Sequence, residues 1–245
     1  MAKLRAFGVS RQLRDGERQF SLAIDCLCLS PGDRKALVGP SGCGKTTAMD
    51  LLALASLPDR ARVLEIEDDS GVHADVAALI DNGTDAGLAR LRARHFGYVL
   101  QTASLFPFLS VHENVGLAQH FAGRIDRALV EELLEALGLA GLGRARPSDL
   151  SVGQQQRVAV ARALAHRPDF LLADEPTAAL DPASARATLQ LCCDIVERSN
   201  GAFLMITHDS DLARDLGFRL VPLKSLSNEF GTTTSIDDGS EGPAG

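Results

Sequence analysis

The sequence predicts an α/β fold around a mainly parallel sheet, with an antiparallel β piece at the amino terminus and an α-helical insertion. Short apolar runs alternate with longer segments of helical periodicity, the layout of a parallel sheet covered by helices. Three of these runs pass directly into polar residues. The 245 residues are 45% hydrophobic and 23% charged, a balance that allows a full core.

The elements are expected in this order. Two extended pieces within residues 4–29 are joined by a turn at 14–17, which favours antiparallel pairing. Residues 36–38 are a strand that ends in a glycine-rich turn at 39–44, and residues 45–56 have helical periodicity. Two further buried strands are expected at 170–173 and 202–206.

Between the strands lies the predicted insertion, residues 102–166. Its helices are expected at 126–137, closed by Gly138, and at 154–166, ending before Pro168. The sequence thus divides into a core of residues 1–101 and 167–226, the insertion, and a polar segment 227–245 that we predict to be a mostly disordered tail.

Composition limits the classes of function. With 25 Lys and Arg against 32 Asp and Glu, the formal net charge is −7, so no nucleic-acid partner is expected. The longest apolar runs, such as 51–55 and 202–206, fall short of the about 18 residues that cross a bilayer, and no secretory signal is visible. We therefore expect a cytoplasmic chain with five reduced cysteines, since none has C-x-x-C spacing.

One motif predicts a nucleotide site. Residues Gly39, Pro40, Ser41, Gly42, Cys43, Gly44, Lys45 and Thr46 fit G-x-x-x-x-G-K-[ST], the phosphate loop of a P-loop NTPase core. Backbone N–H groups and the following helix start, with Thr47, would bind the phosphates of ATP, and Lys45 would face the β- and γ-phosphates. The Thr46 hydroxyl is the expected Mg²⁺ ligand. The alternative is an incidental glycine-rich turn with a chance Lys. Within the phosphate loop, Cys43 is either a reactive thiolate, favoured by the helix start and Lys45, or a small loop residue with a shielded thiol.

Two carboxylates follow the apolar run 170–173. Because a strand alternates its side chains, Asp174 and Glu175 should serve different roles. Asp174 would hold Mg²⁺ opposite Thr46, and Glu175 would act as general base for the attacking water. Alone, such a pair is more often a helix cap or a surface turn; with the phosphate loop, the catalytic interpretation is favoured.

The order of motifs over about residues 4–223 resembles the nucleotide-binding subunit of ABC transporters. Leu150, Ser151, Val152, Gly153 and Gln154 match the L-S-G-G-Q signature except at Val152, and Gln101, the Ala179–Asp181 segment and His208 resemble the Q-loop, D-loop and switch histidine. The resemblance implies a head-to-tail homodimer around two ATP, in which Ser151, Gly153, Gln154 and Asp181 contact nucleotide. It also implies that Gln101 joins the Mg²⁺ site to the insertion and that His208 contacts the γ-phosphate. Independently, Ser151 three residues before Gln154 is a helix-start pattern.

Residues 96–101 and 106–115 look like the branch that serves lipoprotein release, macrolide export and cell division. The resemblance implies an ATP-hydrolysing subunit on the inner face of the membrane that drives a separate permease. We expect the permease to dock near Phe106, Phe108, Leu109 and Val111, because these residues combine apolar bulk with Pro107, which interrupts helix. These four could instead pack in the insertion's own core. Leu13 stands where the family has an aromatic residue against adenine, with Phe20 as the next candidate. Rival functions are an ATP-controlled assembly module without transport and an ABC-type ATPase acting on nucleic acid.

Overall fold

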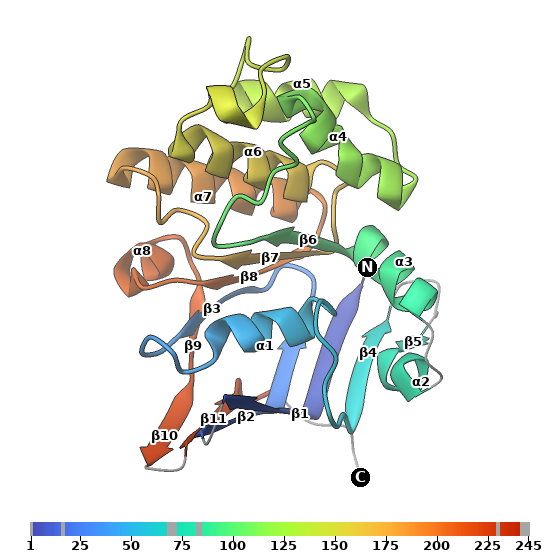
Figure 1. The fold of residues 1–245 in the computed structure, drawn as a ribbon, viewed down its shortest axis with the longest axis vertical. Helices are drawn as coiled ribbons and strands as arrows, with labels where there is room; N and C mark the ends of the chain where they lie inside the picture. Colours follow the sequence, from blue (N-terminus) through green and yellow to red (C-terminus); the bar gives the residue numbers. More distant parts are fainter. Residues whose placement is uncertain (1, 16–17, 68–72, 82–84, 229–230, 241–245) are drawn as a thin grey trace.

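The computed structural model describes residues 2–15, 18–67, 73–81, 85–228 and 231–240. Helices α4 to α7 cover one face of a parallel sheet, and α1 lies between that sheet and a second, largely antiparallel one (Figure 1). The predicted α/β class with a parallel sheet and an amino-terminal antiparallel piece is therefore correct.

The parallel sheet has the order β6-β7-β8-β3-β9, and all its neighbours are parallel. β7 and β8 are buried at every position, which explains why they are apolar throughout rather than alternating. The strands are β3 (Arg34–Val38), β6 (Phe96–Val99), β7 (Phe170–Asp174), β8 (Ala202–Ile206) and β9 (Arg219–Pro222).

The second sheet has the order β10-β11-β2-β1-β4-β5. Its centre is the predicted long antiparallel pair, while residues 16 and 17 of the predicted turn lie outside the described residues. Its strands are β1 (Lys3–Asp15), β2 (Arg18–Leu29), β4 (Val63–Glu67), β5 (His73–Asp75), β10 (Lys224–Asn228) and β11 (Gly231–Asp237).

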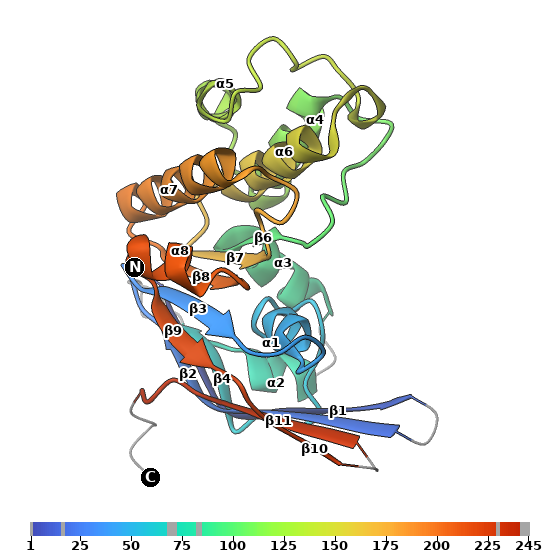
Figure 2. The same cartoon turned by 90° about the vertical axis from the view of Figure 1, so that its left-hand side faces the viewer.

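One hydrophobic core lies around α1 between the sheets, and another joins α4 to α7 to the other face of the parallel sheet (Figure 2). The predicted insertion 102–166 contains α4, α5 and α6 and a 3₁₀ turn at Pro147–Asp149. No helix in the described ranges is both long and apolar enough to cross a membrane. The helices are α1 (Lys45–Leu52), α2 (Val76–Asp81), α3 (Asp85–His95), α4 (Val111–Ala122), α5 (Arg127–Ala136), α6 (Val152–Leu164), α7 (Pro182–Arg198) and α8 (Ser210–Asp215).

The prediction of a disordered tail at 227–245 is wrong for the part that the structure describes. β11 pairs in parallel with β2 from Gly231–Gln19 to Asp237–Cys26, and Thr234 and Ile236 are buried. The polar composition concealed a run of threonines, which are good strand formers, next to Ile236. Residues 229–230 and 241–245 lie outside the described ranges.

Candidate nucleotide site

A cleft of about 520 Å³ opens at the carboxyl ends of β3, β7 and β8. Binding clefts in open α/β sheets lie at this edge. The cleft combines residues from six separate places in the chain: Leu13, Phe20, Ser41, Gly42, Gly44, Lys45, Thr46, Thr47, Gln101, Asp174, Glu175 and His208.

The phosphate loop has the backbone that an anion site requires. Gly42 and Gly44 have φ of 75° and 92°, a region that side chains disfavour. α1 begins directly after Gly44 without a side-chain cap, so its first N–H groups remain free for phosphate. The Lys45 ammonium donates to the carbonyl oxygens of Gly39 and Pro40, at 2.9 Å each, and forms no ion pair within the described residues.

Thr46 and Asp174 meet where a divalent cation is expected. The Thr46 hydroxyl donates to Asp174 Oδ2 at 2.7 Å, and Asp174 is buried. Burial raises the pKa of the Asp174 carboxyl, against the Thr46 hydrogen bond, which lowers it. A hydroxyl and a carboxylate in such a setting are hard oxygen donors that fit Mg²⁺, whose charge would favour the ionised carboxylate.

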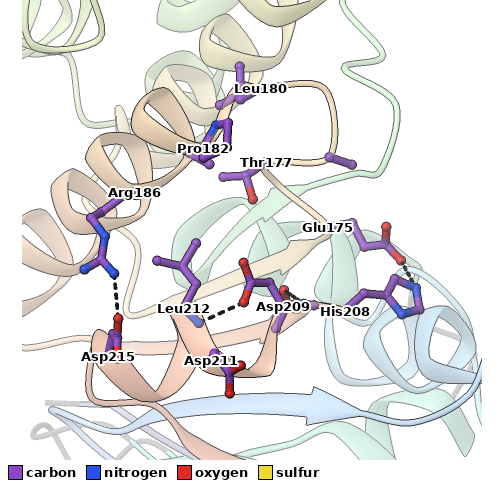
Figure 3. Close-up of a pocket in the computed structure, with 13 residues that line it drawn as sticks. Glu175, Thr177, Leu180, Pro182, Arg186, His208, Asp209, Asp211, Leu212 and Asp215 are labelled. Atoms are coloured by element: carbon purple, nitrogen blue, oxygen red, sulfur yellow. Dashed lines mark hydrogen bonds and ion pairs between the residues drawn. The ribbon is translucent and has the colours of Figure 1, made fainter.

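Glu175 and His208 face each other from the ends of β7 and β8 (Figure 3), with Glu175 Oε1 at 2.8 Å from His208 Nε2. Glu175 has a φ of 48°, and its N–H donates to the Ile206 carbonyl at 3.1 Å. A non-glycine residue in the left-handed region is strained, and such strain is concentrated at functional sites. The backbone thus fixes the carboxylate at the edge of the cleft.

Beyond this pair lies a second cavity of about 490 Å³, lined by Thr177, Leu180, Pro182, Asp209 and neighbours (Figure 3). Asp181 caps α7 by accepting from the N–H groups of Ala183 and Ser184. Hydrogen bonding from the Ser184 side chain, followed by that from these N–H groups, lowers the pKa of the Asp181 carboxyl. Within the described chain, Asp181 is therefore a helix cap, and its contact with nucleotide stays a prediction.

The signature residues form the start of α6. Ser151 Oγ accepts from the Gln154 N–H at 3.2 Å, and Gln154 Oε1 accepts from the Ser151 N–H at 2.8 Å. Val152 is the first helical residue and has no positive φ, so this position needs no glycine here. None of Ser151, Gly153 and Gln154 lines the phosphate-loop cleft of its own chain.

The residues predicted near the base are Leu13 and Phe20, which pair directly across β1 and β2. Both line the cleft, and the Phe20 ring lies so close to Gly44 that any side chain there would overlap it. In the sequence, the feature that indicated Phe20 was that it is an aromatic residue on the second strand of the predicted hairpin, and the structure places it opposite Leu13. Cys43 is buried beside Gly39, which favours the shielded interpretation of its thiol.

A family model described as "ABC transporter" matches residues 25–178. The chain belongs to the ABC transporter family. Lipoprotein-releasing system ATP-binding protein LolD of Novosphingobium aromaticivorans is 41% identical over 219 residues, 83% of this chain and 90% of the relative. Macrolide export ATP-binding/permease protein MacB 2 of Aeromonas hydrophila is 36% identical over 222 residues, 89% of this chain. The chain spans only 32% of that relative and 31% of the syringafactin exporter SyfD of Pseudomonas syringae.

The ABC cassette MJ0796, solved as a dimer in a post-hydrolysis state bound to ADP and Pi, is 32% identical with a TM-score of 0.77. The alignment covers 91% of this chain and 94% of that cassette. The predicted family, P-loop core and export-type resemblance are thereby confirmed. The chain is an ATP-hydrolysing ABC cassette that uses ATP with Mg²⁺.

Proposed function

We propose that two copies of this ABC cassette close head to tail around two ATP molecules and drive a separate membrane permease of an export or lipoprotein-release type. The observation that carries the proposal is the separation of the phosphate-loop cleft from the signature residues within one chain. A second copy would supply the missing donors. Two matched solved structures, both of the cassette MJ0796, are dimers. Two LolD relatives, named as ATP-binding proteins, are matched by this chain over 90% or more of their own length.

Each residue of the cleft would have its own role in ATP hydrolysis. Thr46 and Asp174 would hold Mg²⁺, which supplies positive charge to the phosphates, and Gln101 would complete that side of the site. Lys45 provides a point charge from the phosphate loop. Glu175 accepts the proton of the attacking water, and the hydrogen bond from His208 orients its carboxylate.

Glu175→Gln tests this assignment. It removes the base but leaves the phosphate loop and the metal ligands, so turnover should fall by about 10²-fold or more while ATP binding is retained. ATP should then trap a dimer, measured by size-exclusion chromatography. Lys45→Ala is the matched control, since it should lose binding and dimer together. Turnover of Glu175→Gln within a few-fold of the parent would contradict the role of the base.

We place the permease contact on the docking segment, residues Phe106 to Leu109. Phe106 and Phe108 are 41% and 68% exposed, with ring centroids 5.8 Å apart. Pro107 interrupts regular structure between them. Leu109 is half-buried, whereas Val111 is 0% exposed, so the expectation that Val111 lines a groove is wrong: it packs in the core at the start of α4. An amphipathic helix of the permease would cover the exposed rings.

Phe108→Asp tests the contact. The exposed ring makes folding and basal ATPase insensitive to the change, while stimulation by the reconstituted permease should be lost. Phe121→Asp is the control, because Phe121 is 71% exposed on the last turn of α4, outside the segment. A folded Phe108→Asp protein with unchanged stimulation would exclude this residue from the contact. Stimulation without cargo movement in proteoliposomes would favour the assembly-module alternative.

A further inference from the structure

Arg162 lies near the end of α6 and binds a stretch of chain between the nucleotide cleft and the docking segment. Its Nη1 donates to the Ser104 carbonyl at 3.0 Å and its Nη2 to the Ala103 carbonyl at 3.1 Å. The side chain is half-buried, and burial lowers the pKa of its guanidinium. Within the described residues, Arg162 forms no ion pair with a carboxylate, and its guanidinium donates to these two main-chain carbonyls.

The stretch that Arg162 binds has few other restraints. Residues 102–105 make no hydrogen bond to another main-chain group in the described structure, and the Thr102 and Ser104 hydroxyls only bind each other at 3.1 Å. Ser104 has a φ of 45°, a strained conformation that surrounding contacts must maintain. The other anchor is the Leu105 side chain against the helical core. The two guanidinium bonds therefore determine where this stretch lies against α6.

The stretch 102–105 connects the nucleotide cleft to the docking segment. Ala103 lies two residues after Gln101, which lines the nucleotide cleft, and Ser104 lies two residues before Phe106. α6 begins at the Ser151 cap of the signature and runs 13 residues, about 20 Å at 1.5 Å per residue. A rigid helix of that length moves its two ends together, so displacement at the signature displaces Arg162.

We propose that Arg162 is a positioning residue that couples α6, and with it the signature, to Gln101 through the carbonyls of Ala103 and Ser104. The proposal rests on the proposed function, because it assigns Gln101 to the Mg²⁺ side of the hydrolytic site. When the signature of one copy contacts the ATP bound by the other copy, α6 carries Arg162 with it. Arg162 then positions Gln101 of its own chain, and the docking segment of that chain moves as well.

The test is a double-mutant cycle on the full chain with Arg162→Met and Gln101→Ala. Arg162→Met keeps the aliphatic stem but removes the donors. We expect kcat for ATP to fall about tenfold, since small displacements of a catalytic group have large effects, with KM changed less than threefold because the phosphate loop is intact. If Arg162 acts through Gln101, adding Arg162→Met to Gln101→Ala lowers kcat no further. Multiplicative effects would overturn the proposal.

Arg157→Met is the matched control. Arg157 lies five residues earlier on α6 and donates from Nη1 to the Leu137 carbonyl at 2.8 Å, at the end of α5. Its effect on kcat should multiply with that of Gln101→Ala. If Arg162→Met does not fold, Arg162→Lys replaces it in the cycle. Arg162→Lys should lower kcat by a smaller factor and should likewise cause no further fall in kcat when combined with Gln101→Ala. Glu175→Gln separates the coupling by Arg162 from the proposed function. If Glu175→Gln loses turnover but the effects of Arg162→Met and Gln101→Ala on kcat multiply, only the coupling is rejected. If Glu175→Gln retains turnover, the proposed function is rejected.

Discussion

Phe20 and Leu13 form an apolar wall of the cleft, on which we expect the base to lie. The Phe20 ring lies against Gly44 and opposite Leu13, so the apolar wall for a base comes from the hairpin of β1 and β2. A ring face stacks on any base, whereas selectivity for adenine requires hydrogen bonds to its edge. Leu13 adds apolar area without a π face. We therefore expect this wall to accept a base without distinguishing adenine from guanine.

We expect GTP to support hydrolysis with kcat/KM within tenfold of that for ATP, a difference of less than about 1.4 kcal/mol. Phe20→Ala should raise KM for both nucleotides about tenfold, because stacking contributes about 1–3 kcal/mol. Steady-state ATPase and GTPase assays measure both effects, with Leu13→Ala as the smaller aliphatic comparison. A preference for ATP above tenfold would show that another side chain reads the adenine edge.

At the scale of elements, the start of α4 fixes the docking segment. Asn114 is buried on α4; its Oδ1 accepts from the Phe106 N–H at 2.9 Å, and its Nδ2 donates to the carbonyls of Phe106, Leu109 and Ser110. Ser110 and Glu113 add a capping box. The irregular segment thus obtains from one amide the hydrogen bonds that a regular element would supply, and the two phenylalanines can remain exposed on a fixed backbone.

Asn114→Ala should destabilise the protein by about 2 kcal/mol, because it leaves the part-buried Phe106 N–H and the Leu109 carbonyl without a partner, whereas the carbonyls of Phe106 and Ser110 keep main-chain donors. The free energy of unfolding in urea measures the loss. Permease stimulation should weaken as well, since the docking segment loses its fixed shape. Glu113→Ala, which removes only one partner of the exposed capping box, should cost less than about 1 kcal/mol. Equal losses in the two variants would contradict the role of Asn114.

At the scale of the molecule, the carboxyl-terminal strand joins the two sheets. Asp238, just after β11, accepts from the Lys35 ammonium of β3 at 2.7 Å, and both side chains are buried. Lys35 also donates to the Cys28 carbonyl at 2.6 Å, and the Cys28 N–H donates to Asp238 Oδ2. Burial raises the pKa of the Asp238 carboxyl, but hydrogen bonds from Lys35 and Ser240 and the charge of Lys35 outweigh it and lower the pKa to about 2.

Asp238→Asn should cost about 3 kcal/mol near pH 7, because it leaves the Lys35 ammonium buried without its closest carboxylate. A carboxyl whose pKa is lower in the folded state stabilises the protein above its ordinary value of 3.8. That contribution disappears as the pH falls through the folded value of about 2. The difference in unfolding free energy between parent and variant should therefore be constant above pH 5 and shrink between pH 4 and pH 2. Urea titrations across this range measure it; a difference independent of pH would contradict the ion pair.

The sequence by itself determined the nucleotide chemistry. The phosphate loop, Asp174, Glu175 and His208 could be predicted to share one edge of the sheet because each follows one of the predicted strands, whereas Gln101 was predicted there only through the family resemblance. Apolar runs and helix caps, such as Ser151 before α6, likewise reflect local physics that a short stretch of sequence contains.

Only the tertiary structure decided the features that depend on partners distant in sequence. β11 is a strand because β2, more than 200 residues earlier in the chain, offers a free edge, and Asp238 is buried because Lys35 needs an anion. Val111 and Phe108 are both apolar and only three positions apart. Val111 is buried in the core because it is the first residue of α4, whereas Phe108 lies in the segment before the helix and is exposed. In the sequence, Arg162 looks like an ordinary helix residue. Its partners are the main-chain carbonyls of Ala103 and Ser104, and because every residue has such a carbonyl, the sequence does not show which residues accept these hydrogen bonds.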